Sequence, residues 1–205
     1  MPKLGTINLH GSLLPKYRGA APINWAIING DKVTGVTTFF LQHEIDTGDV
    51  LLQREVKIEP NETAGTLHDK MKEVGALTIL ETVQRLQRGT LSSTPQVDEL
   101  ASHAPKLFLH NCEIDFNKKG IEIDHFVRGL CPFPTAWFTF EGQIAKVFRV
   151  NFEVCTHSLD PGTVQITKKH LRIACLDGFV YIQDVQMSGR KRMEIQQFLN
   201  GYTGF

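Results

Sequence analysis

The chain has 205 residues and a formal net charge of zero, with 22 Lys and Arg against 22 Asp and Glu. This balance gives no global electrostatic reason to expect nucleic-acid binding. No run approaches the roughly 18 apolar residues of a membrane span, and the first residues show no signal-peptide pattern, so we expect a cytoplasmic protein. The four cysteines form no C-x-x-C pair, which argues against a zinc site and a disulfide framework.

The first predicted element is a short strand at residues 6–10, where polar and apolar residues alternate. Alternation of this kind places Asn8 and His10 on the same face of the strand. Gly11 follows, where the chain must leave the strand. A helix is then predicted from Pro22 to residue 28, because proline suits the first helical position.

Two further strands are predicted at residues 35–41 and 49–58, and the turn between them carries Asp46. An amide N–H such as that of Asn8 can stabilise the negative charge that develops on a carbonyl oxygen under attack by an amine. His10 can move the proton that leaves the amine, and a carboxylate at Asp46 can orient the imidazole. The alternative is purely structural, with Asn8 and His10 satisfied by nearby backbone and Asp46 serving only the turn.

The region after residue 60 predicts a long helix, with Thr63 as its N-cap and Thr66 three residues later. Residues 90–105 are polar without a clear period, so we interpret them as containing a linker. The predicted division is residues 1–92, a linker at 93–105, and residues 106–205. In the long helix, spacings of three and four predict one stripe facing a core: Leu67, Met71, Val74, Leu77, Leu80, Val83 and Leu86.

The second half differs in kind, because short alternating runs follow one another between turns. A helix is predicted at residues 121–130 and another at 193–200. Five strands between them indicate a small barrel or sandwich: residues 136–140, 145–154, 163–167, 171–174 and 180–185.

Three segments of the first half together resemble the folate-dependent formyltransferases: NLHGSLLPKYRGAAPINWAIINGD, TGVTTFF and EIDTGDVLLQ. The second half continues the resemblance in the R-G-L-x-P-x-P stretch that starts at Arg128 and in Lys191-Arg192-Met193. The resemblance implies an α/β fold, a partial doubly wound formyltransferase domain, in residues 1–92. It implies a small β-barrel like the oligonucleotide/oligosaccharide-binding (OB) fold in residues 106–205.

The resemblance also implies the site. Its catalytic set matches Asn8, His10 and Asp46, and 10-formyltetrahydrofolate is the implied co-substrate, with no metal. The implied folate-contacting loop is Ser12, Leu13, Leu14 and Pro15. Within the family, the sequence is most similar to the branch that formylates the amino group of initiator methionyl-tRNA. The candidate tRNA contacts are Arg18, Arg190, Lys191 and Arg192.

Two alternatives stay open: a sugar-nucleotide (UDP-amino-sugar) formyltransferase, which shares nearly the same loop, and a non-catalytic RNA-binding fragment. Family members carry a long segment ahead of the Asn-x-His strand, whereas this chain begins almost at that strand. We therefore expect this chain to be inactive, or incompletely folded in residues 1–92, while residues 106–205 fold alone.

Overall fold

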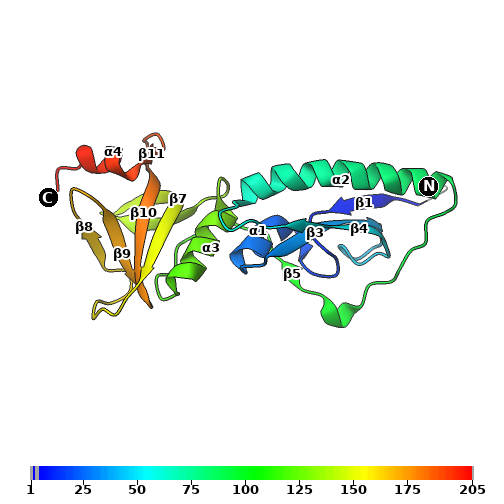
Figure 1. Cartoon of the computed structure of the whole chain (residues 1–205), viewed down its shortest axis with the longest axis horizontal. Helices are drawn as coiled ribbons and strands as arrows, with labels where there is room; N and C mark the ends of the chain where they lie inside the picture. Colours follow the sequence, from blue (N-terminus) through cyan, green and yellow to red (C-terminus); the bar gives the residue numbers. More distant parts are fainter. Residues whose placement is uncertain (1, 3–4, 205) are drawn as a thin grey trace. The chain divides into compact units, whose positions relative to one another are not determined.

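A computed structural model describes residues 2 and 5–204 of the chain (Figure 1). The backbone separates into two compact units: residues 5–27 with 31–107 form unit 1, and residues 28–30 with 108–204 form unit 2. Each unit has its own sheet and its own buried apolar residues. Among the residues described, no helix is both long and apolar enough to cross a membrane.

Unit 1 is built on a three-stranded sheet in the order β1-β3-β4, formed by β1 (Ile7–His10), β3 (Val33–Phe40) and β4 (Val50–Lys57). Both pairings are antiparallel. The three predicted strands therefore form, but without the parallel pairing that a doubly wound sheet requires. Helix α1 (Pro22–Ile28) begins at the predicted proline, and its Ala26 and Ile27 are fully buried.

Helix α2 (Ala64–Gln87) begins as predicted, because the Thr63 side chain accepts from the Thr66 N–H and Thr66 reciprocates in a capping box. The predicted apolar stripe is wrong beyond Val74. Leu77, Leu80 and Val83 are 69%, 54% and 40% exposed. A step of three residues falls about 60° short of a full turn, so residues spaced by three drift around the helix. The residues that are buried mix steps of three with steps of four: Ala64, Leu67, Met71, Gly75, Thr78 and Thr82.

Residues 93–105, which we call the strap, were predicted to be a linker but lie against unit 1. Thr94 forms an isolated bridge with Val50 in β4, and a 3-10 turn (Asp98–Leu100) follows. Strand β5 (His103–Ala104) then pairs in parallel with β2 (Arg18–Gly19). A polar, non-periodic sequence does not reveal this, because the strap is held by backbone hydrogen bonds, polar side chains and one buried alanine rather than by an apolar stripe.

Unit 2 is a six-stranded antiparallel sheet with two helices packed against it. A 3-10 turn (Leu109–Asn111) leads into α3 (Gly120–Leu130), and the strands pair in the order β6-β7-β10-β9-β8, with β11 against β10. In the described residues β6 and β8 end the sheet, so hydrogen bonding does not close it into a barrel. The strands are β6 (Ala136–Phe140), β7 (Gln143–Val154), β8 (Val164–Ile166), β9 (Leu171–Cys175), β10 (Gly178–Met187) and β11 (Met193–Glu194).

One predicted helix boundary, near the end of unit 2, differs in the structure. The predicted helix at 193–200 starts later, as α4 (Ile195–Asn200), because Met193 and Glu194 pair with β10. Helix α3 packs on β7 and β10, and its Val127 and Leu130 are fully buried. The register of β10 against β7 shifts between Ile182 and Val185, an irregularity of the kind that bends a strand.

Candidate active site

His10 lies at the end of β1 and is buried, with 6% of its surface exposed. Its Nε2 is 2.8 Å from the Tyr17 carbonyl oxygen. A carbonyl can only accept, so Nε2 carries a hydrogen in this arrangement. The other ring nitrogen, Nδ1, lies 3.5 Å from Asp46 Oδ2. The predicted approach of His10 and Asp46 is therefore present, although 36 residues of sequence separate them.

Asp46 belongs to the turn between β3 and β4, and its side chain is only 10% exposed. Its backbone is left-handed, with φ of 57°, a region that costs a residue with a Cβ roughly 1–2 kcal/mol. The same Oδ2 that faces His10 accepts from the Gly19 N–H at 2.8 Å. The carboxylate is thus oriented from two sides.

Asn8 sits two residues before His10 in β1 and is exposed. Its Oδ1 accepts from the Leu9 N–H at 2.9 Å. Because that partner can only donate, the bond fixes which end of the amide is oxygen and leaves the NH₂ group as the donor end. The arrangement suits the predicted role of Asn8 as a donor to an oxyanion, and that role stays a prediction.

The Ser12–Pro15 loop is fastened to the sheet beside His10. Thr37 Oγ1 donates to the Ser12 carbonyl at 2.6 Å and accepts from the Leu14 N–H at 3.1 Å. Gln53 Nε2 donates to the Leu14 carbonyl at 2.9 Å. Ser12 and Leu14 are buried in unit 1, at 0% and 4% exposure. Leu13 instead lines a cavity of about 230 Å³, so of the two predicted leucines it is the one placed beside open space.

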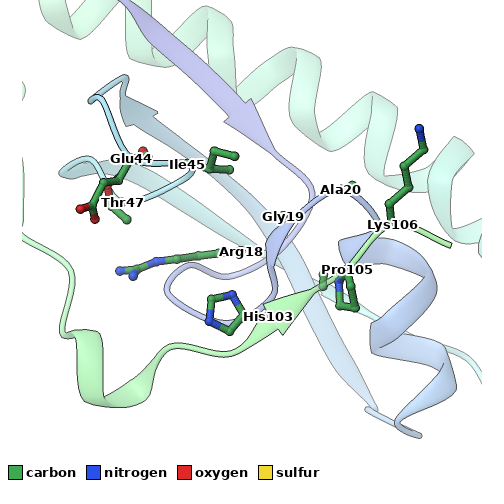
Figure 2. A pocket seen from close by; sticks show the side chains of 10 residues that line it. Arg18, Gly19, Ala20, Glu44, Ile45, Thr47, His103, Pro105 and Lys106 are labelled. Carbon is green, nitrogen blue, oxygen red and sulfur yellow. The ribbon is translucent and has the colours of Figure 1, made fainter.

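A larger cavity of about 630 Å³ adjoins the turn that carries Asp46. Figure 2 shows its lining side chains, which come from three segments that are distant in sequence: residues 18–20, residues 44, 45 and 47, and residues 103–106. Arg18 and His103 project from β2 and β5, while Ile45 and Thr47 flank Asp46 in the turn. The lining includes Gly19, whose N–H donates to Asp46, and both chain neighbours of Asp46, whereas His10 and Asp46 themselves are not part of it.

The candidate tRNA contacts lie in different surroundings. Arg18 is buried, and its guanidinium donates to Gln96 Oε1 and to Asp98 Oδ1. Arg190 and Lys191 are exposed in unit 2. Arg192 donates from Nε to both Asp184 carboxylate oxygens at 3.0 Å and lies 4.2 Å over the Phe148 ring. The bonds to Asp184 raise the pKa of Arg192.

Several groups that position the site were not singled out from the sequence. Backbone atoms supply two of them, the Tyr17 carbonyl and the Gly19 N–H, and no side-chain pattern could identify those. Gln96 contacts the turn of Asp46 from the strap, where the polar composition favours a linker. Thr37 and Gln53 hold the Ser12–Pro15 loop through side chains that, in the sequence, are ordinary strand residues.

In the part of the chain that the structure describes, no group of three or more His, Cys, Asp or Glu residues is placed to hold a metal ion. The four cysteines are free. Fold and site together define an α/β protein with a buried histidine–carboxylate pair at a strand end, an amide side chain two residues earlier on that strand, and a cavity that adjoins the turn of the carboxylate.

Comparison with known families identifies the family to which this α/β protein belongs. The family model described as formyl transferase matches residues 1–83, and the model of the formyl transferase C-terminal domain matches residues 106–203. The chain belongs to the formyltransferase family.

Curated relatives match over nearly the whole chain. A methionyl-tRNA formyltransferase of Flavobacterium johnsoniae is 44% identical over 99% of this chain, and that of Flavobacterium psychrophilum is 45% identical over 99%. The corresponding protein of Chlorobium limicola is 43% identical over 98%. The chain spans 66%, 66% and 64% of the lengths of these relatives.

Solved structures share the fold. HypX from Aquifex aeolicus, in complex with tetrahydrofolic acid, aligns with a TM-score of 0.69 at 22% identity, over 94% of this chain and 34% of that chain. An N-formyltransferase from Helicobacter canadensis, with folinic acid and dTDP-3-aminofucose, aligns at 0.69 and 23% identity, over 88% and 65%. At these identities the likeness establishes the fold alone.

Proposed function

We propose that this chain carries the catalytic residues of a formyl transfer from 10-formyltetrahydrofolate to the α-amine of methionyl-tRNA, the step that prepares the initiator tRNA for translation. The observation that carries the proposal is the buried His10–Asp46 pair, 3.5 Å apart, with Asn8 two residues before His10 on the same strand. The identity of 42–45% to relatives named methionyl-tRNA formyltransferase supports this acceptor over an amino sugar. Such an enzyme would act in the cytoplasm, where tRNA is aminoacylated.

In the proposed reaction the amine nitrogen attacks the formyl carbon. A carbon–nitrogen bond forms to the methionyl amine, and the bond from the formyl carbon to the folate nitrogen breaks. Negative charge collects on the formyl oxygen in between, where the Asn8 NH₂ group donates a hydrogen bond. The proton lost by the amine passes through His10 to the departing folate nitrogen.

His10 performs this transfer only if one ring nitrogen exchanges its protein acceptor for substrate. In the structure both nitrogens face acceptors, the Tyr17 carbonyl and Asp46. Hydrogen bonds of catalytic groups commonly rearrange when substrate binds. Asp46 keeps the ring oriented and stabilises its charge while the proton is in transit.

The folate pocket is proposed at the Ser12–Pro15 loop, with Leu13 as the apolar contact and backbone groups satisfying the polar edge of the pteridine. The C-terminal unit is proposed to be an OB-like tRNA-binding domain, with Arg190 and Lys191 as its phosphate contacts. The support is the match of residues 106–203 to the C-terminal domain of the family and the exposure of both side chains.

The test is formylation of methionyl-tRNA by this chain beside its His10→Ala variant, with 10-formyltetrahydrofolate as donor. Product that disappears in the variant would confirm reaction and site. Product formed on UDP- or dTDP-linked amino sugars instead of methionyl-tRNA would contradict the proposed acceptor. The absence of product from every acceptor would contradict catalysis by this chain alone and would leave its family membership standing.

A further inference from the structure

Both ends of the Gln96 side-chain amide, in the strap, form hydrogen bonds to the segments that hold His10 and Asp46: the turn of Asp46 and residues 17–19. Its Nε2 donates to the Asp46 carbonyl and to the Gly48 carbonyl, each at 2.8 Å. Its Oε1 accepts from Arg18 Nε at 3.0 Å and from Arg18 Nη2 at 2.8 Å. One side chain thus joins residues that are 48 to 78 positions away in sequence.

The orientation of this amide is fixed by its partners. The two carbonyls can only accept and the guanidinium can only donate, so the amide cannot be reversed without losing all four bonds. Arg18 is itself buried and is also held by Asp98 at 2.8 Å. The amide is therefore anchored at its oxygen end and directs its hydrogens at the turn.

The turn needs such a hold because Asp46 has a left-handed backbone, with φ of 57°. A residue with a Cβ stays in that region only where its surroundings impose it. Bonds to the carbonyls of residues 46 and 48 hold the 46–47 and 48–49 peptide planes, one on each side of the Thr47–Gly48 pair. The 46–47 plane is one of the two peptide planes that set the direction in which the Asp46 side chain leaves the backbone, and the 3.5 Å approach of its carboxylate to His10 depends on that direction.

The oxygen end of the Gln96 amide binds residues 17–19, the second segment that holds the His10–Asp46 pair. Arg18 lies between Tyr17, whose carbonyl faces His10 Nε2, and Gly19, whose N–H donates to Asp46 Oδ2. The strap also pairs with this segment through its backbone, since the Arg18 N–H donates to the Ser102 carbonyl at 2.8 Å. Both supports of the His10–Asp46 pair meet at Gln96.

We propose that Gln96 is a positioning residue for the His10–Asp46 pair, and that the strap is part of the active site. Gln96 touches neither reacting atom. It acts by holding the Asp46 turn against residues 17–19. The kinetic part of this inference rests on the proposed function, whereas the structural part does not.

The test uses two substitutions in the full chain. Gln96→Glu keeps the size and the partner for Arg18 but has no hydrogens for the two carbonyls, and Gln96→Leu removes both interactions. The matched control is Gln87→Glu, which makes the same chemical change at an exposed position of α2. The readout is the ¹⁵N and ¹H NMR signals of the His10 ring as a function of pH, assigned with a His10→Gln variant.

The proposal expects the His10 ring signals to move in both Gln96 variants and to coincide with the wild-type signals in Gln87→Glu. In formyl transfer, kcat falls roughly 10- to 100-fold with KM little changed, and the pH profile of kcat shifts with the ring signals. A folded Gln96→Leu variant whose His10 signals match the wild type would overturn the inference. Loss of the fold in both variants would overturn it too, because Gln96 would then hold the fold rather than the site.

Failure of the inference and failure of the proposed function are distinguishable. A wild-type chain that transfers no formyl group, but whose His10 signals respond to Gln96, would contradict the function and support the positioning. A chain that transfers formyl groups equally well with and without the Gln96 amide would support the function and contradict the positioning.

Discussion

At the scale of single residues, the site depends on one imidazole held between two acceptors. The Tyr17 carbonyl faces one ring nitrogen and the Asp46 carboxylate faces the other. The carbonyl offers the ring a dipole, whereas Asp46 offers it a full negative charge, so the carboxylate is the stronger partner when the ring gains a proton. In the proposed reaction the carboxylate is the group that favours the charged ring.

Asp46→Asn is expected to lower kcat of formyl transfer roughly 100- to 10,000-fold. The amide oxygen can still accept from the Gly19 N–H, so the turn is retained, but the charge facing His10 Nδ1 is lost. Steady-state kinetics would measure this, and urea unfolding should show little change in stability. Asp69→Asn, an exposed change of the same charge on α2, is the control. Equal kcat values in the two variants would contradict the role of Asp46.

Substitutions among the three basic residues at 190–192 are expected to have two different effects, one on stability and one on tRNA binding. Arg192→Ala leaves the buried Asp184 without its partner and should lower the stability of unit 2 by about 1–3 kcal/mol. Lys191→Ala should leave stability unchanged and weaken tRNA binding, with the slope of log affinity against log salt smaller by roughly 1. Urea unfolding and filter binding at several salt concentrations measure the two effects. Unchanged stability in Arg192→Ala would show that the ion pair contributes nothing.

At the scale of secondary structure elements, α2 presents two faces that the sequence does not separate. The buried face includes Thr78 and Thr82, whose hydroxyls donate to the carbonyls four residues earlier at 2.8 and 2.7 Å. Thr82 also contacts Thr38 of β3, hydroxyl to hydroxyl at 2.8 Å. The opposite flank carries leucines and a valine in the open.

Leu67→Ala and Leu77→Ala should therefore have very different effects, although both shorten a leucine in one helix. Leu67 is fully buried, and its loss should cost about 2–5 kcal/mol of unfolding free energy. Leu77 is 69% exposed, and its loss should change stability by no more than about 0.5 kcal/mol. Urea unfolding of the two variants beside the wild type is the measurement. Equal losses would show that the exposed flank of α2 is covered in solution.

What the sequence could predict follows from how each feature is held. The capping box at Thr63, the strands and the pairing of His10 with Asp46 depend on local chemistry or on a family pattern, and all three are present in the structure. The register of α2 was misjudged because buried threonines satisfied by backbone look polar. The strap was misjudged because its attachments, such as Gln96 to two carbonyls, involve partners that no local pattern specifies.

At the scale of the whole molecule, the chain divides into two units, each with one tryptophan: Trp25 in unit 1 and Trp137 in unit 2. Each indole donates to a backbone carbonyl of its own unit, Pro105 for Trp25 and Leu109 for Trp137. A Trp25→Phe background therefore lets fluorescence report the unfolding of unit 2 alone, and a Trp137→Phe background reports unit 1. The two probes make the expectation that residues 106–205 fold alone directly measurable.

Unit 2 is expected to lose stability in mild acid. Burial lowers the pKa of His125 below 6.5, and Arg128 adds to this effect. The unfolded chain then binds a proton that the folded unit does not. The stability that unit 2 gains from keeping His125 neutral is therefore fully present above pH 6.5. It is lost as pH falls from 6.5 toward the pKa of His125 in the folded unit. Urea midpoints read by Trp137 from about pH 8 to about pH 5 measure it.

The control for this pH dependence is a second histidine. His125→Asn should flatten the fall in the Trp137 midpoint, because the titrating group is gone. His68→Asn, an exposed change in unit 1, should leave the fall unchanged. A steep fall that survives in His125→Asn would assign the acid sensitivity of unit 2 to another group.

The strap also sets an order of events during synthesis. A nascent chain emerges from its N-terminus, so His10 and Asp46 leave the ribosome well before Gln96, which contacts the Asp46 carbonyl from 50 residues downstream. Translation adds roughly 5–20 residues per second, so for some seconds the histidine and the carboxylate exist without the amide that joins their supports. A nascent chain therefore forms the Gln96 bonds to the Asp46 turn and to Arg18 only once the strap has emerged through Pro105. An expressed piece of unit 1 that ends before Gln96 would contain His10 and Asp46 but not these bonds.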